Sequence, residues 1–91
     1  MDESVDMCAA LTMVKERLDR MPEDTARDRY YTARIEQAIG ELQGTGIKLT
    51  SSVDDLMLVV DYAVWSHQNR DKAEGMPEWL RKRRRERWLR K

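Results

Sequence analysis

The residues with the greatest capacity for chemistry are basic and lie together near the C-terminus. The tract Arg81-Lys82-Arg83-Arg84-Arg85-Glu86-Arg87 stands between Trp79 and Trp88. Arginine forms paired hydrogen bonds with phosphates and carboxylates, and tryptophan stacks on bases or fills pockets in protein partners. We therefore predict that this segment contacts a partner, protein or DNA. The residues assigned to that contact are Trp79, Arg81, Lys82, Arg83, Arg84, Arg85, Arg87 and Trp88.

The charge distribution also indicates an electrostatic partner. Residues 78–91 hold eight basic and two acidic side chains, a local charge of +6, whereas the rest of this formally neutral chain carries −6. Such asymmetry favours binding to nucleic acid, to an acidic protein or to another copy of the chain. A solvated run of charge with no partner is the alternative.

The sequence offers few groups for catalysis or metal binding. It has one histidine and one cysteine, so a zinc site of the usual kind cannot be assembled within one chain. We expect His67 to be a half-buried packing residue and Cys8 to behave as a small apolar residue. Asp54 and Asp61 share a helical face that could hold a cation, but capping and solvation explain them more simply. We therefore expect no enzyme, and no catalytic, cofactor-binding or metal-binding residues.

Size and composition favour one small domain. A chain of 91 residues buries only about 60–65% of the surface that its unfolded form exposes, so a monomer would be modestly stable. No stretch approaches the roughly 20 apolar residues that cross a bilayer, and the acidic N-terminus lacks the basic start of a secretion signal. We expect synthesis in a reducing cytosol and no membrane partner.

Apolar residues recur at helical spacing in the first half of the chain. One stripe consists of Met7, Leu11, Val14, Leu18 and Met21. It predicts a helix with an N-cap at Ser4 and an end at Pro22. A second stripe consists of Tyr31, Ile35, Ala38, Ile39 and Leu42. It predicts a helix that starts at the capping box Thr25-Ala26-Arg27-Asp28 and stops at Gly44 and Gly46.

The third predicted helix is the centre of the core. It starts at the capping box Ser52-Val53-Asp54-Asp55, after a loop in which Ile47 and Leu49 should plug the core. Its broad apolar side consists of Val53, Leu56, Met57, Val59, Val60, Ala63 and Val64. On the opposite, polar side a second stripe predicts a subunit interface, formed by Leu58, Tyr62 and Trp65. The alternative is that the first or the fourth helix of the same chain covers this stripe.

The fourth predicted helix has no single apolar face. Pro77 fits its first turn, but four apolar side chains point in separate directions, namely Trp79, Leu80, Trp88 and Leu89. Either the helix frays after Leu80, or Trp88 and Leu89 meet a second molecule. The predicted fold is all-α, a small bundle of about four helices with a central apolar third helix and a basic C-terminal helix or tail. Residues 1–77 form its core and residues 78–91 the basic helix or tail, within a single domain.

Three segments together resemble a known protein family. They are Tyr31-Thr32-Ala33-Arg34-Ile35-Glu36-Gln37-Ala38-Ile39 leading to Gly46-Ile47, then Asp54-Asp55-Leu56-Met57-Leu58-Val59-Val60-Asp61-Tyr62-Ala63-Val64-Trp65, then Arg70-Asp71 followed by Met76-Pro77 and a Leu- and Arg-rich end. In this order, over residues 27–91, the chain is similar to the small helical head-tail connector proteins of tailed phages, also called adaptor or head-completion proteins.

The resemblance implies a structural virion protein. Connectors form a ring of identical subunits, here expected to be dodecameric, beneath the portal of the capsid, where they extend the DNA exit channel and dock the tail. The expected partners are other copies of the chain, the portal protein, a tail or stopper protein, and genomic DNA through non-specific contact. The expected location is the virion neck, after synthesis in the host cytoplasm. The tract from Arg81 to Arg87 is denser in arginine than the family pattern, so portal binding, DNA binding or both stay open.

A small nucleic-acid-binding or regulatory protein is the alternative to a connector. On that interpretation the Arg-rich C-terminal helix neutralises phosphates, and binding weakens steeply as salt rises.

Overall fold

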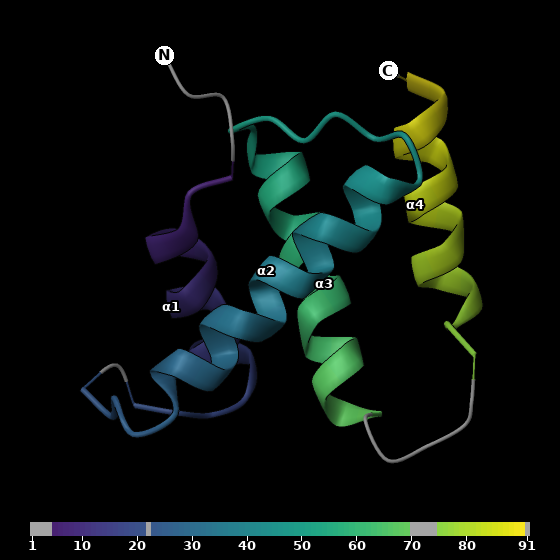
Figure 1. Cartoon of the computed structure of the whole chain (residues 1–91). Coiled ribbons are helices and arrows are strands. Elements are labelled where there is room, and N and C mark those ends of the chain that lie inside the picture. The colour runs from purple at the N-terminus through teal and green to yellow at the C-terminus, as the bar shows by residue number, and fades with distance from the viewer. Residues whose placement is uncertain (1–4, 22, 70–74, 91) are drawn as a thin grey trace.

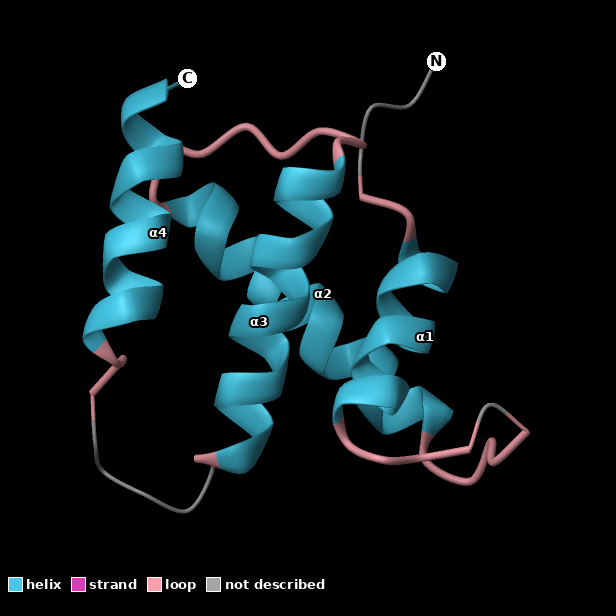
Figure 2. Ribbon diagram, turned by 180° about the vertical axis from the view of Figure 1, so that it is seen from behind, coloured by secondary structure: helices cyan, strands magenta, loops and turns pink. Residues whose placement is uncertain are grey.

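The described residues form four helices, and the other three pack around the third. The computed structural model describes residues 5–21, 23–69 and 75–90, and it describes residue 90 by its backbone alone. The helices are α1 (Met7–Arg17), α2 (Asp28–Gly44), α3 (Val53–Gln68) and α4 (Glu78–Arg90). Helix α3 lies in the middle, with α1 at one edge, α4 at the other, and α2 crossing it (Figures 1 and 2). The described ranges contain no strand, so the predicted all-α bundle with a central third helix is confirmed. No helix in them is long and apolar enough to cross a membrane.

Helix α1 starts and ends at different residues from those predicted. Asp6 is its N-cap, and its carboxylate accepts hydrogen bonds from the backbone N–H groups of Cys8 and Ala9. The helix ends at Arg17, and Asp19 then adopts a positive φ of 58°, a conformation that stops a helix. Met21 lies beyond this end and is exposed, so its assignment to the apolar stripe is wrong. The predicted N-cap Ser4 and terminator Pro22 lie outside the described residues.

Helix α2 has the predicted apolar stripe but not the predicted capping box. Its N-cap position is Arg27, which makes no side-chain cap hydrogen bond. The carboxylate of Asp28 instead pairs with Lys15 of α1, at 2.9 Å between Nζ and Oδ1, and Lys15 is thereby neutralised where it is buried. The helix ends at Gly44 as predicted. Its buried residues are Tyr31, Ile35, Ala38 and Leu42.

The apolar residues of the loop between α2 and α3 pack into the core as predicted. Ile47 and Leu49 are both buried. Ser52 caps α3, because its Oγ accepts a hydrogen bond from the backbone N–H of Asp55 at 3.2 Å. Leu56, Val59, Val60, Ala63 and Val64 of the apolar side of α3 pack into or against the core. Val53 occupies the first helical position and is exposed.

A tight approach between this loop and α4 requires glycine at position 46. Gly46 has a φ of +100°, and a Cβ built there would lie 2.9 Å from Nε1 of Trp88. We expect Gly46→Ala to lower the free energy of unfolding by about 1–2 kcal/mol, because both the backbone and the indole ring would have to shift. Thermal unfolding followed by circular dichroism measures this loss.

Gly40→Ala is the matched control for this loop substitution. Gly40 lies within α2, and nothing comes within 4 Å of a Cβ built there. Alanine at a helical position should therefore raise stability by about 1 kcal/mol. Equal melting temperatures for the two variants would contradict the proposed strain at Gly46.

Candidate functional site

The inner face of α4 is built from arginine as well as from apolar side chains. Leu80, Arg83 and Arg87 recur at helical spacing, and Leu80 is completely buried. Arg83 forms an ion pair with Asp61 of α3, and Arg87 forms one with Asp55. Helix α4 therefore continues to Arg90 without an apolar stripe, and the predicted alternative of fraying after Leu80 is wrong.

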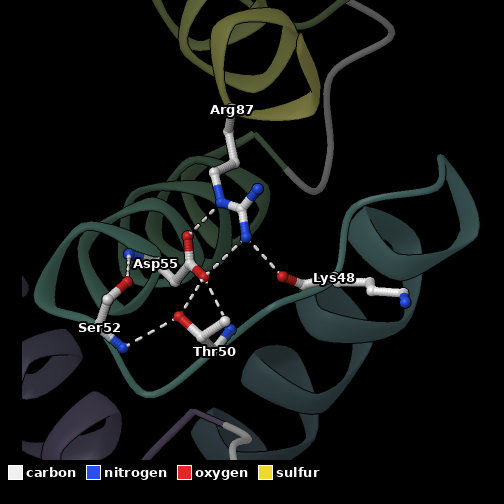
Figure 3. A network of polar contacts seen from close by, with 5 residues as sticks. All are labelled: Lys48, Thr50, Ser52, Asp55 and Arg87. Carbon is white, nitrogen blue, oxygen red and sulfur yellow. Dashed lines mark hydrogen bonds and ion pairs between the residues drawn. The ribbon is translucent and has the colours of Figure 1, made fainter. Parts of the chain in front are cut away.

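Asp55 is the centre of the larger of the two ion-pair networks (Figure 3). Arg87 donates to it from Nε to Oδ1 at 2.6 Å and from Nη2 to Oδ2 at 3.1 Å, and Nη2 also donates to the carbonyl oxygen of Lys48. Thr50 donates to Oδ2 from its backbone N–H at 2.7 Å and from its hydroxyl at 2.9 Å. Asp55 is only 1% exposed, so these bonds offset the cost of burying its charge. The network joins α3, the preceding loop and α4.

The ionisation of this network follows from its geometry. Burial acts to raise the pKa of Asp55, but the hydrogen bonds from Arg87 and Thr50 outweigh it and hold the pKa below its usual value of 3.8. The hydrogen bond to Asp55 in turn raises the pKa of Arg87. Both groups are therefore charged at neutral pH.

Asp61 joins three helices through one carboxylate. It pairs with Arg17 of α1 as well as with Arg83 of α4, and it is 6% exposed. Because two guanidinium groups occupy its oxygens, Asp61 and Asp54 do not form the cation site considered from the sequence. Within the described ranges no group of three or more carboxylate, histidine or cysteine side chains is placed to hold a metal ion.

The outer face of α4 is basic and aromatic. Arg81, Lys82 and Arg85 are exposed, and Trp79 and Trp88 are 50% and 39% exposed. Four of the residues assigned to partner contact share a shallow hollow of about 250 Å³ with the end of α2; it is lined by Thr45, Arg81, Arg84, Arg85 and Trp88. The structure thus divides the basic tract, because Arg83 and Arg87 face the chain itself while the exposed cations face outward.

The predicted subunit stripe on α3 is mostly covered by the chain itself. Leu58 and Tyr62 are 3% and 8% exposed, and Trp65 is half-buried against the core. Leu58 lines a hollow together with Arg87 and Leu89 of α4. Leu58 and Tyr62 therefore leave little surface for the predicted subunit interface. The alternative, cover by the first or the fourth helix, agrees with the position of Leu58 beside α4, and an interface at Trp65 stays a prediction.

Tyr62 is held by an acidic partner from α2. Its hydroxyl donates to Glu41, and burial, the hydrogen bond and the negative charge of Glu41 raise its pKa to about 12. Because the folded-state pKa exceeds the unfolded value of about 10, this contribution to stability is complete below about pH 10 and is lost as the pH rises through 12.

We expect the absorbance titration of the folded protein to contain a phenolate step near pH 12 that belongs to Tyr62. Tyr62→Phe should remove this step and leave the other tyrosine steps in place. The measurement is ultraviolet absorbance near the phenolate maximum as pH is raised. An unchanged titration curve in Tyr62→Phe would contradict the assignment.

The histidine and the cysteine differ in how well the sequence predicted them. His67 is half-buried, and its Nδ1 shares a hydrogen bond of 2.9 Å with the hydroxyl of Tyr30, which confirms the packing prediction. Cys8 is exposed and forms no disulfide, and its behaviour as a small apolar residue stays a prediction.

Sequence reasoning missed the structural role of Asp55 and Asp61. Asp55 was interpreted as a capping residue and Asp61 as part of a polar face. A usable signal was present, since Asp55 and Asp61, two of the three acids of a mainly apolar helix, precede two arginines spaced four apart, Arg83 and Arg87. Acids at buried helical positions require cationic partners.

Comparison with protein-family models, with curated proteins and with solved structures finds no significant match to this chain.

Proposed function

We propose that this chain is a structural assembly protein of the phage head-tail connector kind. In this proposal, copies of the chain form a ring beneath a portal, and the outer face of α4 docks the neighbouring virion component. The observation that carries the proposal is the division of α4 into an inner face anchored by ion pairs and an outer face of cations and tryptophan.

The anchoring makes the outer face a defined surface rather than a loose basic tail. Arg83 and Arg87 fix the rotation of α4 about its own axis, because each reaches a different carboxylate of α3. Among the described residues, no carboxylate lies within ion-pair distance of Arg81, Lys82 or Arg85. Their charge therefore remains available to a partner.

The residue types on this face are those of protein interfaces. Tryptophan and arginine are enriched among the residues that contribute most to binding energy. Leu89, which follows Trp88 in the chain and lines the hollow with Leu58 and Arg87, is also 64% exposed. An exposed leucine suits a protein surface better than a phosphate backbone. An acidic protein surface with apolar pockets is the partner that this combination supports.

The assembly state tests the proposal. Light scattering coupled to size exclusion, with nucleic acid removed, should detect either a large discrete ring or monomers that form one when portal protein is added. A stable monomer or dimer that ignores portal at low and at high salt would overturn the connector function.

A second candidate, a small nucleic-acid-binding protein, is supported by the hollow beside α4. Three guanidinium groups and the ring of Trp88 lie together there, an arrangement that suits a phosphate next to a stacked base. On this candidate the affinity for DNA falls with salt, with a log-log slope of about −0.9 for each phosphate contacted. Docking to portal that tolerates modest salt would favour the connector.

A further inference from the structure

A second basic hollow lies on the other side of the molecule from α4. It has a volume of about 600 Å³ and forms where the start of α2 meets the end of α3. Helix α2 starts on the side of the molecule opposite α4 (Figures 1 and 2). The polar side chains that line it are Arg27, Arg29, Tyr30, Arg34 and His67. Neither the connector function nor the nucleic-acid alternative uses this hollow.

The positive charge of the hollow is not balanced locally. Three guanidinium groups line it, and no carboxylate of the described residues does. The acid of the first turn of α2, Asp28, is paired with Lys15 of α1. The carboxylate of Asp24 accepts a hydrogen bond from the backbone N–H of Ala26. The hollow therefore attracts an anion.

Arg34 is held in place by neutral groups only. Its Nε donates to the hydroxyl of Tyr30 at 3.0 Å, and its Nη1 donates to the hydroxyl of Ser66 at 2.8 Å. The same Tyr30 hydroxyl is bonded to His67. This differs from Arg83 and Arg87, whose charges are matched by carboxylates. Arg34 is thus fixed in position while its charge remains unneutralised, as a preorganised ligand site requires.

We propose that this hollow binds a phosphate group. A phosphate offers more acceptor oxygens and more charge than a carboxylate, so it can pair with three guanidinium groups at once. Arg34 would contribute the fixed contact, and the exposed Arg27 and Arg29 would close on the anion from the start of α2. The phosphate can belong to a small phosphorylated compound or to a nucleic-acid backbone.

Amide-detected NMR titration with inorganic pyrophosphate at low salt tests the site. We expect saturable shifts at residues 26–34 and around Ser66 and His67. Because charge-assisted hydrogen bonds are lost, Arg27→Gln/Arg29→Gln should weaken binding about tenfold or more. Both side chains are exposed, so the fold should be retained, and the spectrum of the free variant checks this. If the double variant unfolds, Arg29→Gln alone carries the test.

Arg81→Gln/Arg85→Gln is the matched control, since it removes two exposed arginines of α4 that do not line this hollow. The pyrophosphate shifts at residues 26–34, Ser66 and His67 should persist in it with unchanged affinity. Equal loss in the two double variants, shifts confined to α4, or a polyglutamate peptide that binds as tightly as pyrophosphate would each overturn the proposal. A short DNA duplex that shifts the same amides and is displaced by pyrophosphate would assign the phosphate to nucleic acid. Binding of pyrophosphate without the duplex would assign it to a small compound. Neither result depends on ring formation, so the connector function is tested separately by the assembly state.

Discussion

Asp55→Ala is expected to lower the free energy of unfolding by about 3 kcal/mol. The substitution removes the carboxylate that binds Arg87 and two donors of Thr50, and it leaves those donors without an acceptor. Breaking a buried ion pair typically costs about 3–5 kcal/mol. We expect the lower end because Arg87 is near enough to the surface to reach water. Since small domains have total stabilities of about 5–15 kcal/mol, urea unfolding should reveal a large loss.

Glu36→Gln is the control, because Glu36 is an exposed acid on α2 and its neutralisation should change stability by less than about 0.5 kcal/mol. A double substitution, Asp55→Leu/Arg87→Met, should recover much of the loss, since a buried pair can be replaced by packed apolar groups. Equal stability of Asp55→Ala and Glu36→Gln would contradict the role assigned to Asp55.

The same network should make the protein sensitive to acid. The pKa of Asp55 is lower in the folded than in the unfolded chain, so its stabilisation is complete above the unfolded value and is lost as pH falls through the folded value. The stability difference between the natural sequence and Asp55→Ala should therefore shrink below about pH 4.

Reversing the outer charges of α4 should separate binding from folding. We expect Arg81→Glu/Arg85→Glu to reduce docking to the partner by more than about tenfold, because the acidic surface of the proposed partner would repel each introduced carboxylate. The melting temperature should change little, because neither residue forms an ion pair within the described part of the chain. Surface plasmon resonance against portal protein, combined with thermal unfolding, measures both quantities.

The matched pair for this experiment is Arg83→Glu/Arg87→Glu. It introduces the same change of charge on the same helix, but it places two carboxylates against Asp61 and Asp55. We expect it to detach α4 and to lower both stability and docking. If both double variants lost docking with the fold equally intact, the division of α4 into two faces would be wrong. A cluster substitution of Arg83, Arg84 and Arg85 would not resolve this question, because it changes both faces at once.

The sequence predicted the elements of the fold because their signals are local. The apolar stripe of α2 and the cap at Ser52 depend on residues a few positions apart, and both are confirmed. The end of α1 was misplaced because Asp19 adopts a positive φ, a conformation that is uncommon for residues other than glycine. Pro22 is the more visible stop signal in the sequence, but α1 ends before it, at Arg17.

The way in which α4 packs against α3 within the chain could not be predicted from apolar periodicity. A helical wheel counts apolar residues, and only Leu80 among the apolar residues of α4 is fully buried. Two ion pairs between residues 22 and 32 positions apart also hold α4 against α3, Arg83 with Asp61 and Arg87 with Asp55. Such pairing depends on how α3 and α4 lie against each other. The same limitation applies to Leu58 and Tyr62, because apolar spacing does not indicate that Leu58 lies beside α4 or that Tyr62 bonds to Glu41 of α2.

The two buried acids of α3, Asp55 and Asp61, should differ in how freely their partners can vary during evolution. Asp61 forms ion pairs with Arg17 of the first helix and with Arg83 of the last. Substitution of either arginine therefore leaves the carboxylate with one cationic partner. Among the ion pairs of the described residues, Asp55 has a single cationic partner, Arg87. Arg17 and Arg83 can therefore be exchanged one at a time across a lineage, whereas Asp55 and Arg87 would have to change together.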